Sequence, residues 1–164
     1  MRYVLKQKLM SFGDDFDVLD ESGRKAFYFD SKIGGFTKKI IVEGPNQEKL
    51  ALIHKKHFTY RPTYIIKKNG EEIARIFKKA FSFRKQFIID VPGPNDITII
   101  GRFAEHSYRF LRNGAQIAEV SKKWFRSKDT YGVEVENSDD TLLVLCGAVI
   151  VDLLCHPGRD SSFE

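Results

Sequence analysis

A run of ten residues without a polar side chain, Leu142–Val151, is the feature that most limits how this chain can fold. A bilayer span needs about 20 such residues, so the run is half the required length. Asn137–Asp140 can cap a helix and place negative charge at its N-terminus, and His156–Gly158 can end it. A helix that is apolar on every side must be buried on every side. The run therefore predicts a central helix over about residues 139–155, enclosed by the rest of the protein.

The remainder of the chain contains a nine-residue pattern in three copies. The pattern reads aliphatic, Ala, any, Ile or Val, any, Lys, Lys, any, Phe. The copies begin at Leu50, Ile73 and Ile117, so the second follows the first by 23 residues and the third follows the second by 44. An aromatic residue stands fourteen positions after the start of each copy. Self-similarity of this kind indicates a repeated supersecondary unit.

The repeated unit is predicted to be a β-hairpin. Asn69-Gly70 and Asn113-Gly114 each separate two apolar runs, and Asn-Gly supplies the positive φ angles that a two-residue hairpin turn needs. A turn over Asp20–Gly23 separates two further runs. Strand patterns recur about every ten residues from Tyr3 to Val135, a spacing typical of a sandwich or barrel. Because closure removes exposed strand edges, we expect a closed antiparallel sheet over about residues 1–136, within one domain spanning 1–164.

Composition agrees with strands and with a reducing compartment. Fourteen Phe and six Tyr against two Met favour strands over a helical bundle. The only cysteines are Cys146 and Cys155, which on one helix would lie about 13 Å apart along its axis, too far to bridge. The first eight residues alternate polar and apolar side chains, so we expect no secretory leader. These features predict a cytoplasmic location.

Charge is unevenly distributed along the chain. Residues 49–85 hold eleven Lys and Arg against two Glu, a net charge of +9, whereas residues 136–164 have a net charge of −5. A polarised surface of this kind can attract anionic partners. No cofactor is expected.

The Lys-Lys pairs of the repeat are the candidate binding residues. Neighbouring residues on a strand point to opposite faces, so only one Lys of each pair can share a face with its equivalents. One interpretation is a cationic stripe that binds lipid headgroup phosphates. The other is a set of solvated charges that protect strand edges. The candidates are Lys55, Lys56, Lys78, Lys79, Arg84, Lys85, Lys122 and Lys123.

Other conspicuous side chains have structural interpretations beside functional ones. Asp152 interrupts the apolar run; it is either a buried acid or a helix-end residue that pairs with an Arg or Lys of the barrel wall or reaches solvent. His54 and His57 would lie on opposite faces of a strand, and His106 and His156 stand alone, so no metal site is expected.

The aromatic residues after each Lys-Lys pair, Phe58, Phe81 and Trp124-Phe125, are predicted to lie in the barrel core because they repeat at equivalent positions. The alternative places them at a membrane interface or stacks them on a nucleic-acid base. No nucleophile elbow, phosphate-binding Gly-rich loop or Cys-x-x-Cys motif is present, which favours a protein that is not an enzyme.

Taken with this architecture, several motifs give the chain a family resemblance. They are Tyr3 with Lys6-Gln7-Lys8, Ser11–Asp14, the Ile-Ala-x-Val-x-Lys-Lys strands, Gly101-x-Phe103 with Tyr108, Asp129-Thr130-Tyr131-x-Val133, and the apolar helix with Asp152. The chain resembles the LURP-one-related family, within the tubby C-terminal-domain-like group that includes phospholipid scramblases. The resemblance covers almost the whole chain. It implies a twelve-stranded barrel around a central C-terminal helix. Tubby domains bind phosphoinositides through basic side chains, and scramblases act at membranes.

Two main functions are compatible with these observations. The first is a binding module for anionic membrane lipids or phosphoinositides, peripheral to the membrane and without a transmembrane segment. The second is a protein-interaction or regulatory scaffold, which predicts an exposed apolar or aromatic patch. Nucleic-acid binding is permitted by a pI near 9.1 but is disfavoured by the missing recognition motif and the acidic C-terminal segment.

Overall fold

Twelve antiparallel strands close into a barrel in the computed structural model, which describes residues 1–8, 15–32, 39–57, 59–122 and 130–155. The elements in chain order are β1 (Arg2–Lys8), β2 (Asp15–Leu19), β3 (Lys25–Lys32), β4 (Lys39–Glu43), β5 (Lys49–Lys56), β6 (Thr63–Lys68), β7 (Glu71–Lys78), β8 (Gln86–Asp90), β9 (Ile97–Arg102), η1 (Phe103–Glu105), β10 (Ser107–Arg112), β11 (Ala115–Ser121), β12 (Thr130–Val135), η2 (Ser138–Asp140) and α1 (Thr141–Cys155).

Each strand pairs with its neighbour in sequence, and the barrel closes where β1 meets β12. Tyr3 lies opposite Val133 and Leu5 opposite Tyr131 in that last ladder. The predicted hairpins are confirmed as β2–β3, β6–β7 and β10–β11. Closure leaves the ring of twelve strands without a free edge, as expected for a hairpin repeat.

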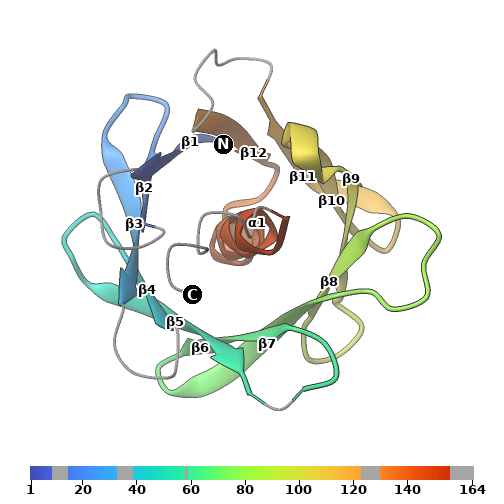
Figure 1. Ribbon diagram of the computed structural model, residues 1–164. Coiled ribbons are helices and arrows are strands. Elements are labelled where there is room, and N and C mark those ends of the chain that lie inside the picture. Colours follow the sequence, from blue (N-terminus) through green and yellow to red (C-terminus); the bar gives the residue numbers. More distant parts are fainter. Residues whose placement is uncertain (9–14, 33–38, 58, 123–129, 156–164) are drawn as a thin grey trace, which may run out of the picture.

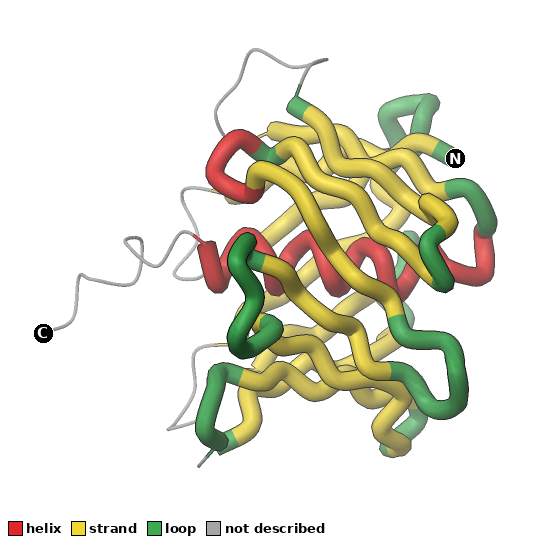
Figure 2. Tube along the Cα trace, turned by 90° about the vertical axis from the view of Figure 1, so that its right-hand side faces the viewer, coloured by secondary structure: helices red, strands yellow, loops and turns green. Residues whose placement is uncertain are grey.

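The predicted central helix is confirmed. Figure 1 shows α1 end-on in the middle of the ring of strands, and Figure 2 shows it running along the length of the barrel. Residues Val144 to Asp152 of α1 are all buried. They pack against the inward positions of the strands, which alternate with half-exposed outward positions; Ile53, Ile76 and Val120 are fully buried examples. Because the helix has no polar face, enclosure by the barrel removes its whole apolar surface from water.

The start of the helix is fixed by polar contacts. The side chain of Asn137 accepts a hydrogen bond from the backbone N–H of Asp139 at 3.0 Å, as its position before the helix predicts. Asp140 is buried and pairs with both terminal nitrogens of Arg112 on β10, at 2.9 and 3.1 Å. The bidentate pair ties the first turn of the helix to the barrel wall.

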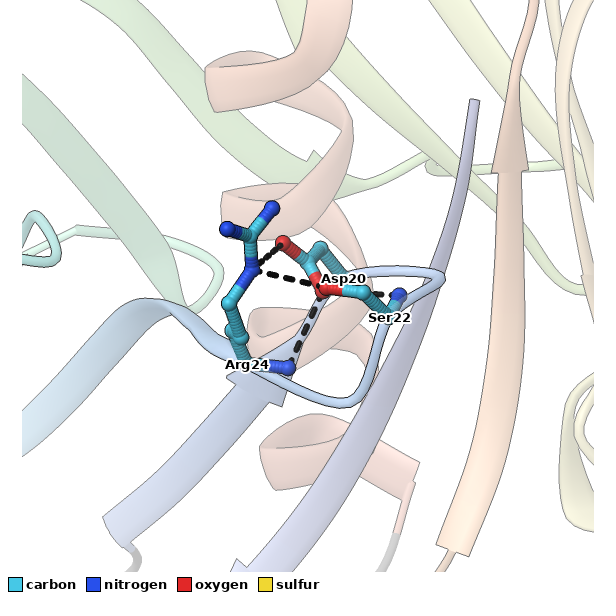
Figure 3. Close-up of polar contacts among 3 residues, drawn as sticks. All are labelled: Asp20, Ser22 and Arg24. Carbon is cyan, nitrogen blue, oxygen red and sulfur yellow. Dashed lines mark hydrogen bonds and ion pairs between the residues drawn. The ribbon is translucent and has the colours of Figure 1, made fainter.

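The turn between β2 and β3 is held by one carboxylate. Oδ1 of Asp20 accepts hydrogen bonds from the Ser22 hydroxyl at 2.6 Å and from the backbone N–H groups of Ser22 and Arg24 at 2.9 and 3.0 Å (Figure 3). These hydrogen bonds, led by that of the Ser22 hydroxyl, lower the pKa of Asp20. The predicted turn over Asp20–Gly23 is therefore a compact polar structure.

Substitution of Gly114 tests whether the β10–β11 hairpin needs a residue that adopts a positive φ angle. Asn113 and Gly114 have φ angles of 50° and 79°, as a two-residue primed turn requires. A Cβ at Gly114 would meet no heavy atom within 4 Å, so the expected cost of a side chain is conformational rather than steric. Gly114→Val is expected to lower the free energy of unfolding by about 1–2 kcal/mol, because a β-branched residue resists the left-handed region. Urea denaturation measures this change. Gly114→Asn is the control, because Asn adopts the left-handed region more readily than Val. Equal losses of unfolding free energy in the two variants would contradict a conformational cause.

Candidate functional site

The two ends of the barrel differ in structure. Odd-numbered strands all run in one direction, so β5, β7 and β11 end at the same end of the barrel. α1 ends there too, because Asp152 near its C-terminus contacts His106, which follows β9. We call this end the basic end; in Figure 2 it lies on the left. The opposite end, which we call the turn end, carries the tight hairpin turns and η2.

Strand alternation places the first Lys of each pair on the inward side. Ala51 and Ile53 are buried inward residues of β5, and Lys55 continues their alternation. Lys78 continues the inward alternation of β7 in the same way. Both side chains are exposed because they stand where the strands end. Lys56 and Lys79 take the opposite parity, as the sequence pattern predicts for one member of each pair.

Lys85 connects these lysines to the end of the central helix. Its Nζ lies 5.9 Å from the ring centre of the buried Phe87. Burial raises the pKa of the Cys155 thiol, while the positive charges of Lys85 and Lys78 act in the opposite direction. Lys78 at the end of β7 and Lys85 before β8 thus stand at the same end of the barrel as the last residue of α1.

Four further cations lie on the same side of the barrel. Arg61 places its guanidinium 3.8 Å from the ring centre of Phe77, on the outer wall. The backbone N–H of Lys79 donates to the carbonyl of Gln86 at 2.8 Å. The pKa of Glu72 is lowered mainly by the hydrogen bond from Arg75, and the charge of Lys56, the last residue of β5, makes a small contribution. Arg84 is exposed in the loop before β8.

We call seven side chains of β5–β8 and their loops the basic arc. The segments 55–62 and 78–86 contain no acidic residue, so no carboxylate within them neutralises this charge. The basic arc consists of Lys55, Lys56, Arg61, Lys78, Lys79, Arg84 and Lys85.

The third Lys-Lys pair is not part of this arc. Lys122 follows β11, which is six strands away from β5 in a ring of twelve, so it stands across the barrel from Lys55. Lys123 lies outside the described residues. Six of the eight candidate residues thus belong to neighbouring strands and loops, and the repeat does not generate one continuous stripe through Lys122.

Acidic side chains elsewhere at the basic end have partners of their own. Asp15 is buried and accepts hydrogen bonds from the Ser31 backbone N–H at 2.7 Å and the Tyr28 hydroxyl at 2.9 Å. Glu105 pairs with Arg102 at 2.9 Å. Asp152 pairs with His106. Each of these three carboxylates thus has a local partner outside the basic arc.

Aromatic side chains project from the two loops of the basic arc. Tyr60 in the β5–β6 loop is 92% exposed, and Phe81 and Phe83 in the β7–β8 loop are 98% and 111% exposed. The predicted core position is therefore wrong for Phe81. The inward alternation ends with β7 at Lys78, and Phe81 lies in a loop at a φ of 57°. Phe58, Trp124 and Phe125 lie outside the described residues.

Sequence reasoning also missed Tyr60 and Phe83. A signal for them was present, because Phe81-Ser82-Phe83 has two basic residues on each side along the chain. A run of three residues between such charges is too short to predict a strand, which indicates an exposed loop.

A buried polar pair lies beneath the basic end. His106 Nε2 and Asp152 Oδ1 are 2.8 Å apart, and both residues are buried. The Tyr131 ring centre lies 4.8 Å from that of His106, and burial raises the pKa of Tyr131. Of the interpretations offered for Asp152, the structure bears out the buried acid, and it shows His106 in contact with that acid. The two residues are 46 positions apart, so only the barrel brings them together.

A surface depression lies outside the two loops of the basic arc. A shallow depression of about 280 Å³ is lined by residues that include Glu72, Arg75, Asp90 and Pro92, toward the turn end. Glu72 and Arg75 form an ion pair with each other. Among the residues that the structure describes, no three His, Cys, Asp or Glu side chains form a group suited to a metal ion.

Comparison with known proteins identifies the family. No helix in the described part of the chain combines the length and apolar character needed to cross a membrane. No curated protein matches the chain. The family model described as LURP-one-related matches residues 1–152, which include all twelve strands and most of α1. The chain belongs to the LURP-one-related family.

Proposed function

We propose that this protein is a non-catalytic module that binds the headgroups of anionic phospholipids at a membrane surface. The observation that carries the proposal is the basic arc, in which two adjacent hairpins bring seven cationic side chains to one end of the barrel without an acidic residue in either segment. Each Lys or Arg held near an anionic lipid surface contributes about 1 kcal/mol of attraction. The group recognised is the headgroup phosphate, together with its surrounding negative charge.

Sedimentation with vesicles tests the proposal. The protein is expected to bind vesicles of phosphatidylcholine mixed with phosphatidylserine or a phosphoinositide more tightly than vesicles of phosphatidylcholine alone, and raised salt should weaken the binding. A soluble inositol phosphate that competes at low concentration would show that the site binds a single headgroup rather than the charged surface. Equal binding to all vesicles would refute the proposal.

A charge-matched pair of variants locates the binding surface. Replacing Lys55, Lys78 and Lys85 with Gln is expected to reduce binding to anionic vesicles about 100-fold, since three charges contribute about 3 kcal/mol. The control replaces Lys25, Lys49 and Lys68, which are exposed near the turn end, and changes net charge by the same amount. Similar losses in both variants would indicate an effect of net charge rather than a site.

A protein-interaction scaffold is the second candidate, because the exposed side chains of Tyr60, Phe81 and Phe83 are the kind of patch that it predicts. The two candidates differ in the role of lipid. A scaffold would bind its partner equally well with and without anionic vesicles, and it would bind the vesicles no better than an unrelated protein of the same charge.

A further inference from the structure

The loops of the basic arc present aromatic side chains to solvent in a defined arrangement. Tyr60, Phe81 and Phe83 are almost completely exposed, although large apolar side chains are normally at least partly covered in a folded protein. The β5–β6 and β7–β8 loops belong to adjacent hairpins, so all three side chains lie at the basic end on one side of the barrel. Their exposure is thus concentrated rather than scattered.

Local hydrogen bonds hold both loops in shape. The Thr59 hydroxyl donates to the carbonyl of Arg61 at 2.7 Å, and the Ser82 hydroxyl donates to that of Arg84 at 2.6 Å. Phe81 adopts a left-handed backbone conformation that side-chain-bearing residues avoid. The loop therefore keeps an apolar ring in water at a conformational cost, which points to a partner that covers it.

The charges around the rings indicate the kind of partner. Phe81 and Phe83 stand between Lys78-Lys79 and Arg84-Lys85, and Tyr60 precedes Arg61. Rings surrounded by cations match the interface of an anionic bilayer, where phosphates accept the cations and aromatic rings settle at headgroup level. A protein partner of the same shape would need a hydrophobic pocket ringed by acids, whereas a bilayer offers both features everywhere.

We infer that Tyr60, Phe81 and Phe83 insert into the interfacial layer of an anionic membrane and orient the barrel with its basic end toward the lipid. This inference rests on the proposed function and adds a second, apolar component to it. Electrostatic attraction is weakened by salt, whereas burial of aromatic rings is not. The two components are therefore separable by experiment.

The first experiment measures vesicle binding by three proteins. They are the wild type, the double variant Phe81→Ala/Phe83→Ala, and the variant in which Lys55, Lys78 and Lys85 are replaced with Gln. The phenylalanine variant is expected to bind vesicles of phosphatidylcholine and phosphatidylserine at least about tenfold more weakly, because transfer of a single ring from water is worth about a factor of ten or more. That loss should persist at high salt, whereas the lysine variant and the wild type should converge as salt is raised. An unchanged affinity of the phenylalanine variant would overturn the inference.

The second experiment measures insertion directly. Phe83→Trp is made in a Trp124→Phe background, which leaves a single tryptophan in the chain, and its fluorescence is recorded with vesicles containing brominated lipids. Strong quenching and a blue shift are expected. Gln116→Trp, at an exposed position on β11 near the turn end, is the matched control and should remain unquenched.

The outcomes distinguish the two proposals. Vesicle-bound protein with an unquenched Phe83→Trp signal would leave lipid binding in place and overturn the insertion, making the rings a docking surface for a protein. If the wild-type protein binds anionic vesicles no better than phosphatidylcholine vesicles, both proposals are overturned. Quenching together with a salt-resistant loss in Phe81→Ala/Phe83→Ala would support the insertion.

Discussion

Replacing His106 with Leu is expected to destabilise the protein by about 3–5 kcal/mol, because it leaves the buried carboxylate of Asp152 without its imidazole partner. The two side chains are 2.8 Å apart, and Asp152 is 5% exposed, so water cannot replace the lost contact without opening the end of the barrel. Urea denaturation followed by circular dichroism gives the free energy of unfolding of each variant.

The double variant His106→Leu/Asp152→Leu is the control for this prediction. Removing both partners leaves neither polar group of the pair behind, and an apolar pair of similar volume can be as stable as the polar pair that it replaces. The double variant is therefore expected to be more stable than His106→Leu alone. If the double variant instead loses the sum of the two single losses, the residues act independently and the pairing is not what stabilises this end of the helix.

The contact between the helix and the barrel wall gives the second large effect. A Cβ at Gly147 would lie 2.8 Å from the Phe110 ring and 3.0 Å from Cδ1 of Ile89, so the absence of a side chain lets α1 approach β10 and β8 closely. Phe110→Ala is expected to cost about 3–5 kcal/mol through the cavity that it leaves. Gly147→Val is expected to cost about 1–3 kcal/mol through overpacking.

The combination of these two substitutions provides the test. In Phe110→Ala/Gly147→Val the added methyl groups enter the space that the ring has vacated, so the double variant should lose less stability than the sum of the single variants. The same denaturation series measures all four proteins. Strict additivity would contradict the close packing of helix and wall, and a helix outside the barrel would make Gly147→Val nearly neutral.

The fold was largely predictable because its signals are local. The Asn-Gly turns specify two-residue hairpins, and alternation along each strand specifies which side chains face inward. The apolar run of α1 has no polar face to expose to water, so its burial follows from its composition. Alternation also predicted that only one lysine of each pair continues the inward face, as Lys55 and Lys78 do.

The candidate site was only partly predictable because it depends on position around the barrel. Lys55, Lys78 and Lys122 occupy equivalent positions in the sequence repeat. Strand order nevertheless places the first two on neighbouring hairpins and the third on the opposite wall of the barrel. The same repeat assigned Phe81 to the core, although it stands three residues beyond the end of β7. The sequence pattern continues past the end of the strand. Alternation predicts which side chains face inward only within the strand itself, because the pleated backbone ends there.

Sequence alone determined the hairpin units, their inward faces and the need to enclose one apolar helix, since each follows from the chemistry of neighbouring residues. Tertiary structure alone decided that Asp152 meets His106, that seven cations gather on one arc, and that Tyr60, Phe81 and Phe83 share one end of the barrel. The physical reason is range: backbone preference and alternation act over a few residues, whereas these groupings require the direction and order of strands that are set only when the barrel closes.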